Sequence, residues 1–282
     1  MKIGVIGGGT VGRATARCWL EHAEEVMVFD VDPKRSTVSD DLARVMELSN
    51  LIFICLPEDK IESFLSGSAL GLEQSATFKV QCQEANFVIK STVPVGTTRK
   101  LRDKYGLVNL CHSPEFLTER CAVTDAQMPA QLIIGRPDTH DADGDCYQLW
   151  LEVHRKRFPG VPIYDMSSDE SELVKLIVNA FAATKVSFFN EMRSLSDALG
   201  LDWQRVIEGV LGDGRIGHSW TKVPGPDGKR GFGGKCLPKD LLMLIESFRE
   251  TRREIPDLSK QPLNPILNAV QARNSTDRKE QG

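Results

Sequence analysis

A short apolar segment that runs directly into a glycine-rich turn is the feature that most constrains the fold of this chain. Residues 2–6 (KIGVI) have the composition of a strand, and GGGTVG follows at residues 7–12. Residues 13–20 have a helical pattern, and a second apolar run at 25–29 ends in Asp30. Strand, Gly-x-Gly-x-x-Gly, helix, strand and acid in this order predict the first βαβ unit of a Rossmann-type sheet.

The same motif predicts a dinucleotide site. Gly7 would allow the tight turn, Gly9 would admit the pyrophosphate, and Gly12 would let the helix pack closely on the strand. Asp30 lies at about the expected distance beyond the glycines, where an acid accepts hydrogen bonds from the adenosine ribose. Because an acid there would repel a 2′-phosphate, the motif favours NAD over NADP. The basic pair at residues 34–35 weighs against that preference.

Beyond residue 50 the chain continues to alternate apolar runs with helical patterns. Strands are predicted at residues 51–56, 87–90, 108–111, 131–135 and 161–164, and helices at 58–70 and 145–158, whereas residues 71–85 favour neither state. The run 51–56 (LIFICL) is apolar throughout, as expected for a parallel strand buried on both faces. We therefore predict a Rossmann-type, doubly wound parallel α/β domain over residues 1–165.

Polar side chains follow two of these predicted strands. Ser91 and Thr92 come directly after the strand at 87–90, and ligands bind at the carboxyl ends of strands in open parallel sheets. Helix capping explains the two hydroxyls equally well. Glu115 and Glu119 follow the strand at 108–111 and stand four residues apart, so on one helical turn they would share a face. We expect that face to meet the ligand cleft, although paired acids also occur on solvated helices.

The second half of the chain is predicted to be helical and to centre on one long helix. The pattern runs from residue 168 to 199 without a break, which corresponds to about 45–50 Å. One small domain does not cover a helix of that length, so we expect a homodimer formed through residues 168–199. Lys175 and Asn179 share one face of it, as a pair that binds an alkoxide would, although a solvated lysine is the simpler explanation.

One cysteine stands in an unusual setting in the segment GFGGKCLPKD at residues 231–240. Glycines allow close approach of backbone and ligand, and positive charge beside a thiol favours the nucleophilic thiolate. The apolar run after Asp240 predicts a helix there, which would place Cys236 just before a helix N-terminus. A buried structural cysteine is the ordinary alternative.

The remaining segments carry less information. Residues 201–211 are predicted to be helical, residues 251–262 to be a polar linker and residues 264–272 to be a short helix, with a disordered tail at 273–282. The predicted domains are therefore 1–165, a helical central and dimerisation domain at 166–262 that carries the cysteine loop, and a short terminal segment at 263–282.

The composition excludes several classes of protein. A net charge of −4 argues against a nucleic-acid partner, because such proteins usually carry a basic face. No apolar run in the sequence is long enough to span a membrane, and the chain opens on a predicted strand rather than a signal peptide. The seven cysteines include no CxxC pair and no other metal-ligand spacing. We therefore expect a cytoplasmic protein with reduced thiols and with no metal, membrane or nucleic-acid partner.

Five segments together resemble one enzyme family. They are GGGTVG, STVPVGTT, SPEFLTE, ELVKLIVNAFAATKVSFFNE and GFGGKCLPKD, and they occur in family order over residues 1 to about 275. In these segments the chain resembles the nucleotide-sugar 6-dehydrogenases, which include the UDP-glucose and GDP-mannose dehydrogenases. The resemblance implies that a sugar C6 alcohol is oxidised to the carboxylate with two NAD⁺, with UDP-glucose to UDP-glucuronate as the expected reaction.

The resemblance also implies catalytic roles. Cys236 would capture the C6 aldehyde as a thiohemiacetal, which a second hydride transfer converts into a thioester. Lys175 and Asn179 would stabilise the alkoxide and the oxyanion. A four-electron oxidation needs a covalent intermediate that holds the aldehyde between the two hydride transfers.

Further residues carry implied roles in hydrolysis and binding. Asp240 and Thr92 would position water, and Glu119 would be the acid and base. The residues implied to contact NAD are Gly7, Gly9, Thr10, Val11, Gly12, Asp30, Arg35, Thr92, Glu119 and Lys239. Those implied to contact the substrate are Glu115, Phe116, Leu117, Lys175, Asn179, Phe232 and Gly233.

The sequence departs from the family pattern in two places. Family members usually carry a third domain that binds the nucleotide of the sugar donor, and this sequence ends about where the linker to that domain would begin. The segment Cys55-Leu56-Pro57-Glu58 also lacks the threonine that the family generally has there. A separate chain that supplies the domain, or a smaller sugar phosphate as substrate, would fit the first departure. Two other hypotheses stay open: a single-step β-hydroxyacid-type dehydrogenase that uses Lys175 and Asn179, and a catalytically inactive NAD-binding regulatory subunit.

Overall fold

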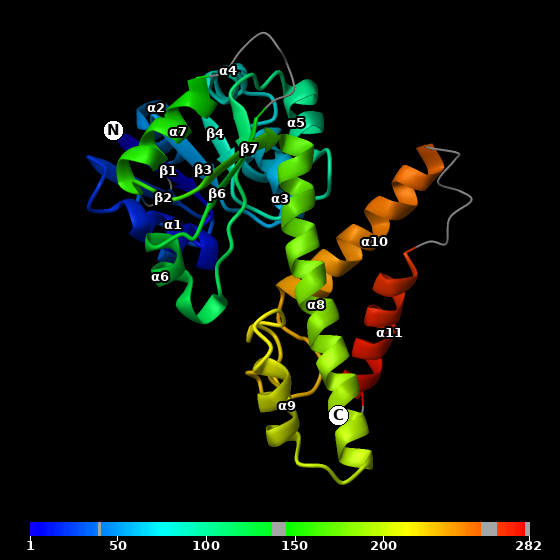
Figure 1. Ribbon diagram of the computed structural model, residues 1–282. Helices are drawn as coiled ribbons and strands as arrows, with labels where there is room; N and C mark the ends of the chain where they lie inside the picture. The colour runs from blue at the N-terminus through cyan, green and yellow to red at the C-terminus, as the bar shows by residue number, and fades with distance from the viewer. Residues whose placement is uncertain (39–40, 137–144, 255–263, 280–282) are drawn as a thin grey trace. The chain divides into compact units, whose positions relative to one another are not determined.

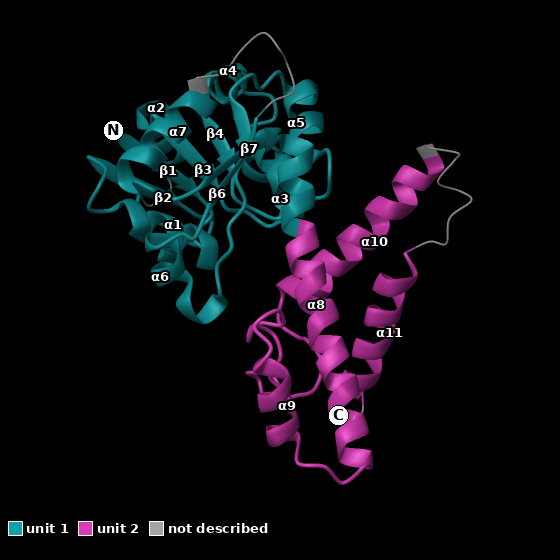
Figure 2. Ribbon diagram, in the orientation of Figure 1, with its two compact units in different colours: residues 1–175 teal, residues 176–282 magenta. Residues whose placement is uncertain are grey.

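The computed structural model describes residues 1–38, 41–136, 145–254 and 264–279 (Figure 1). The chain divides into two compact units, Met1–Lys175 and Leu176–Gly282 (Figure 2). The boundary falls within one long helix, α8 (Ser168–Ala198), which contributes its first two turns to the first unit.

The first unit is built around a seven-stranded sheet. Its strands are β1 (Lys2–Ile6), β2 (Glu25–Phe29), β3 (Leu51–Ile54), β4 (Phe87–Ile89), β5 (Leu110–His112), β6 (Leu132–Arg136) and β7 (Ile163–Ser167). They lie in the order β2-β1-β3-β4-β5-β6-β7. Neighbours from β2 to β5 are parallel, β5 and β6 are antiparallel, and β6 and β7 are again parallel. The last two strands therefore run against the first five, a reversal that the predicted doubly wound parallel sheet did not specify.

Helices cover both faces of this sheet, as a doubly wound fold requires. On one face lie α2 (Leu42–Leu48), α3 (Glu58–Leu65), α4 (Ala76–Glu84) and α5 (Thr97–Tyr105); on the other lie α1 (Thr10–Trp19) and α7 (Asp145–Arg157). The strand residues alternate accordingly: Ile52 and Ile54 join the first core, and Leu51 and Phe53 the second. These strands are apolar on both faces, as expected for a sheet buried between two helical layers. The predicted doubly wound α/β fold is therefore confirmed.

The strand order also locates the ligand edge of the sheet. The chain leaves β1 for β2 on one side, and β3 pairs with β1 on the other side. In open α/β sheets such a reversal marks the crevice, beyond the carboxyl ends of the strands, in which ligands bind. The turn at residues 7–12 follows β1 at this reversal.

The second unit contains helices and no strand among the residues that the structure describes, and residues 212–235 form a loop between two of its helices. Beside most of α8 it contains α9 (Trp203–Leu211), α10 (Cys236–Glu254) and α11 (Pro265–Lys279). Phe189 of α8 packs with Trp203 and Ile207 of α9 and with Val223 in a small buried cluster. No helix among the described residues is long and apolar enough to cross a membrane.

Three expectations about this half were wrong. The helix after the cysteine begins at Cys236 itself rather than beyond Asp240, and it extends through 254, into the expected linker. The terminal helix continues to Lys279, so residues 273–279 are helical rather than disordered. The rest of the linker and residues 280–282 lie outside the described residues. In the first half, the undecided stretch 71–85 contains α4.

Candidate functional site

The glycine turn has the shape that a dinucleotide requires. Gly7 has a φ of +99°, and its N–H donates to Phe29 O across the sheet. A Cβ on Gly12 would lie 1.7 Å from Gly7 O, so no larger residue fits where α1 meets β1. A Cβ on Gly9 would have no described heavy atom within 4 Å, which leaves that side of the turn open.

Asp30 is held beside this turn at the end of β2. Its Oδ2 accepts a 2.6 Å hydrogen bond from Gly8 N, and its Oδ1 accepts one of 2.8 Å from Asp32 N. Arg35 pairs with Asp32, with Nε 3.3 Å from Oδ2. These residues fit NAD, because Asp30 is held in place beside the turn and none of the described residues occupies the open side of Gly9. When bound, NAD would accept a hydride. Thr10 and Val11 are the first two residues of α1, beside the predicted position of the NAD phosphates.

Two residues at the ends of β4 and β5 are structural. The Ser91 hydroxyl donates to Leu56 O at 2.5 Å. His112 is fully buried; because Ser91 O can only accept, the His112 Nε2 donates to it at 3.2 Å, and Nδ1 accepts from Ser171 Oγ at 2.8 Å. Burial lowers the pKa of His112 to about 3, so this imidazole stays neutral. The Ser91 hydroxyl thus ties the segment after β4 to the segment after β3, which is a structural contact other than the predicted helix cap.

Glu115 and Lys175 form a buried pair within the first unit. Lys175 Nζ lies 3.4 Å from Glu115 Oε1 and 5.1 Å from the centroid of the Phe116 ring. The other oxygen, Oε2, accepts a 2.6 Å hydrogen bond from Leu117 N. The cation, the acid and the ring predicted to line the substrate site therefore lie together, with the Lys175 side chain only 5% exposed.

Glu119 does not share a helical turn with Glu115. Residues 113–118 contain no helix, and Glu119 begins a short 3₁₀ turn, η3 (Glu119–Cys121), where it is exposed. Thr118 N donates to Asp125 Oδ2 at 2.7 Å, which directs the chain away from a continuous helix. The expectation that both acids share one face was wrong.

Thr92 is half-buried three residues beyond β4.

A half-buried lysine, Lys90, at this edge of the sheet was not predicted to belong to the site. Lys90 Nζ lies 5.7 Å from the centroid of the Trp150 ring and donates to Ser113 Oγ at 3.5 Å. Burial lowers the pKa of Lys90 to about 8, although Cys55 and Glu115 oppose the shift. The only signal in the sequence was a charged residue at the end of an apolar strand.

In the second unit, Cys236 is exposed at the first residue of α10. One turn later Asp240 is 1% exposed, and its Oδ2 accepts a 2.5 Å hydrogen bond from Asn179 Nδ2 of α8. Lys239 Nζ lies 3.5 Å from Asp240 Oδ1. The structure thus brings Asn179, Lys239 and Asp240 into contact and places the thiol four residues before Asp240 on α10.

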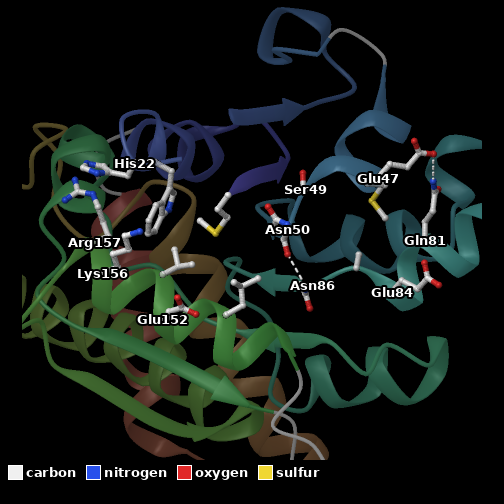
Figure 3. A pocket seen from close by; sticks show the side chains of 16 residues that line it. His22, Glu47, Ser49, Asn50, Gln81, Glu84, Asn86, Glu152, Lys156 and Arg157 are labelled. Atoms are coloured by element: carbon white, nitrogen blue, oxygen red, sulfur yellow. Dashed lines mark hydrogen bonds between the residues drawn. The ribbon is translucent and has the colours of Figure 1, made fainter. Parts of the chain in front are cut away.

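A large cavity lies elsewhere, at the opposite edge of the sheet (Figure 3). It has a volume of about 1000 Å³, and Met1, Asn50 and Asn86 in its lining precede β1, β3 and β4. Ligands of open α/β sheets bind at the carboxyl ends, so this cavity is not the dinucleotide site. No group of three or more potential metal ligands occurs among the described residues.

Comparison with known proteins connects both units to one family. The NAD-binding domain model of the UDP-glucose/GDP-mannose dehydrogenase family matches residues 34–155, and its central-domain model matches 169–264. Together these matches cover more than half of the chain. The chain belongs to the UDP-glucose/GDP-mannose dehydrogenase family. The predicted family and the predicted cofactor, NAD, are thereby confirmed.

Individual members of the family resemble the chain over most of its length. It is 30% identical over 276 residues to the UDP-glucose 6-dehydrogenase of Campylobacter jejuni, a match that covers 88% of this chain and 68% of the relative. It is 29% identical to the Pseudomonas aeruginosa UDP-glucose 6-dehydrogenase, a match that covers 98% of this chain and 65% of that relative. The structure of a UDP-glucose dehydrogenase from Pyrobaculum islandicum aligns with a TM-score of 0.74 at 27% identity and covers 98% of this chain and 68% of that one. The chain thus spans about two thirds of the length of these relatives.

Proposed function

We propose that this chain catalyses the NAD-dependent oxidation of a nucleotide-sugar C6 alcohol to the carboxylate, with UDP-glucose as the preferred substrate. The observation that carries the proposal is an exposed thiol at the start of α10, one turn before a buried Asp240–Asn179 pair. A single-step dehydrogenase needs no thiol in such a setting. Membership of the family supports the choice of NAD and of a nucleotide sugar.

The proposed chemistry gives each residue a defined task. In the first oxidation the C6 alcohol loses a hydride and a proton, and Lys175 and Asn179 stabilise the charge on its oxygen. The Cys236 thiolate then forms a bond to the aldehyde carbon, and the carbonyl electron pair moves to oxygen. Loss of a second hydride leaves a thioester.

Hydrolysis completes the reaction. A water molecule positioned by Asp240 and Thr92 adds to the thioester carbon, Glu119 accepts its proton, and the C–S bond breaks to return the thiolate. The balance is one alcohol, two NAD⁺ and one water converted into one carboxylate, two NADH and three protons. The Glu119 side chain is exposed to solvent at the start of η3, where it can exchange the accepted proton with water.

Substrate class is tested by incubating the protein with NAD⁺ and a panel of UDP-glucose, GDP-mannose and glucose 6-phosphate, with NADH absorbance as the readout. We expect NADH from UDP-glucose and none from the sugar phosphate. Turnover of the sugar phosphate alone would contradict the nucleotide-sugar assignment. NAD binding without turnover of any of the three would instead favour the regulatory-subunit hypothesis.

A further inference from the structure

Side chains hold the backbone of Gly231 and Phe232, which leads into α10. Gly231 N donates to Asn190 Oδ1 at 3.1 Å, and Phe232 N donates to Asn274 Oδ1 at 2.7 Å. Arg278 donates from Nη2 to Gly231 O at 3.0 Å and from Nε to Phe232 O at 3.2 Å. Every backbone polar group of this dipeptide therefore bonds to a side chain.

Two of these three side chains belong to α11. Asn274 and Arg278 are four residues apart and thus share one face of that helix. The Arg278 guanidinium also binds Asp227, with Nη1 2.6 Å from Oδ2, and this hydrogen bond lowers the pKa of the Asp227 carboxyl. A planar guanidinium that bridges three acceptors is fixed in orientation as well as in place. The family's central-domain match ends at residue 264, before α11 begins.

The glycines of the loop fit closely against this helix. A Cβ on Gly233 would lie 2.7 Å from Arg278 Nη2, and a Cβ on Gly231 would lie 2.5 Å from Asn274 Oδ1. Gly231 also has a φ of +70°, which side chains disfavour. Gly231 is therefore favoured by its backbone conformation and by its contact with α11, whereas a side chain at Gly233 would have to displace the Arg278 guanidinium.

The helix itself is anchored to α8. Arg273 Nη2 lies 2.8 Å from Asp277 Oδ1 and donates to Ser194 Oγ of α8 at 3.0 Å. Asp277 is 1% exposed, so this ion pair is shielded from solvent on the acidic side. The contacts thus run from α8 through α11 to the segment that bears the thiol.

We propose that Asn274 and Arg278 are positioning residues, which act through the backbone of Gly231 and Phe232 to hold the segment that bears Cys236. The inference rests on the proposed function for the role of that thiol. Covalent catalysis requires the nucleophile to be placed within about 0.5 Å of its productive position. A loop without regular secondary structure meets this requirement only when other groups fix its backbone.

The test compares four single variants of the full chain. Asn274→Ala and Arg278→Ala remove the contacts, Asn274→Asp keeps the acceptor for Phe232 N, and Lys279→Ala removes an exposed positive charge on the same helix. Arg278→Met, which keeps the aliphatic stem, replaces the alanine variant if that variant does not fold. Hydrogen–deuterium exchange of peptides spanning 230–236 is measured beside kcat and KM for UDP-glucose oxidation.

We expect about tenfold faster exchange at 231–232 and about tenfold lower kcat in the variants that remove the contacts, with KM for NAD within about twofold of wild type. Asn274→Asp and Lys279→Ala should match wild type. Unchanged exchange, or faster exchange with unchanged kcat, would overturn the proposal. If the wild type oxidises no nucleotide sugar, the proposed function fails, and exchange alone decides whether α11 holds the loop.

Discussion

At the scale of single residues, Gly9 and Gly12 are glycines for different reasons. The Cβ of any residue at position 12 would collide with the chain itself, at 1.7 Å from Gly7 O. Gly9 has an ordinary φ of −69°, and none of the described residues approaches its Cβ position within 4 Å. The folded chain therefore gives no reason for a glycine at position 9, whereas a pyrophosphate that contacts the backbone does.

This difference predicts that Gly9→Ala folds normally and loses NAD. We expect Tm within about 2 °C of wild type and an NAD dissociation constant raised at least about tenfold, or about 1.4 kcal/mol. Calorimetric titration with NAD⁺ provides the measurement. Gly209→Ala, whose Cβ also meets nothing within 4 Å, is the matched control and should bind NAD as wild type does. Unchanged affinity in Gly9→Ala would contradict the placement of the pyrophosphate.

The residues that could be predicted from the sequence are those with a local signature. Gly7, Asp30 and Cys236 stand in patterns whose spacing carries the meaning. Lys90 and Glu172 could not be found in this way, because distant elements create their environments. Glu172 follows two other acids at the start of a helix, and nothing in that run distinguishes the buried acid from its exposed neighbours.

At the scale of elements, Glu172 connects α8 to α5 inside the first unit. It is fully buried; its Oε2 accepts from Gly96 N at 2.6 Å, and its Oε1 accepts from Thr98 N at 2.8 Å and Thr98 Oγ1 at 2.6 Å. Burial raises the pKa of Glu172 to about 7, a shift that these hydrogen bonds oppose and Asp169 increases. Arg99 pairs with Asp169 at 3.1 Å, beside this contact.

The raised pKa predicts a specific pH dependence of stability. Because the pKa in the folded protein lies above the ordinary value of 4.5, the folded state binds the proton more tightly. Stability should therefore fall as pH rises from about 4.5 to about 7, by about 3 kcal/mol at most. In Glu172→Gln, denaturant unfolding should lose this component of the pH dependence. The exposed neighbour variant Glu170→Gln should keep it, and equal slopes in wild type and Glu172→Gln would refute the explanation.

The elements themselves were largely predictable, and the exceptions have physical causes. The apolar runs and the long helical pattern decide most strands and helices locally. The reversed direction of β6 and β7 depends on pairing between distant segments, which no local pattern records. The polar residues 273–279 look disordered in sequence, yet Arg273 and Arg278 bind groups outside their own helix and stabilise it.

At the scale of the whole molecule, α8 carries an exposed apolar stripe. The residues of this stripe recur every four or seven positions, as residues on one face of a helix do, and the last of them lies just beyond the end of α8. They are Leu173, Ile177, Phe181, Phe188, Leu195 and Leu199, with exposures of 38%, 51%, 63%, 55%, 54% and 62%. We propose that a second copy of the chain covers this stripe, as the length of the helix predicts.

Light scattering after gel filtration tests the dimer. The wild type should have twice the 31.3 kDa mass of one chain, and Phe181→Asp combined with Phe188→Asp should have the mass of one chain. Val80→Asp, at another exposed apolar residue, is the control and should remain dimeric. A monomeric wild type, or a double variant that stays dimeric, would contradict the proposed interface.

The most direct test of the central claim is the number of NADH molecules formed per UDP-glucose consumed, in wild type and in Cys236→Ala. Oxidation through a thioester on Cys236 predicts two NADH per sugar for wild type and at most one for the variant, because only the second oxidation needs the thiol, with NAD binding unchanged in both. One NADH per sugar in wild type, with the same value in Cys236→Ala, would contradict the account and identify a single-step dehydrogenase.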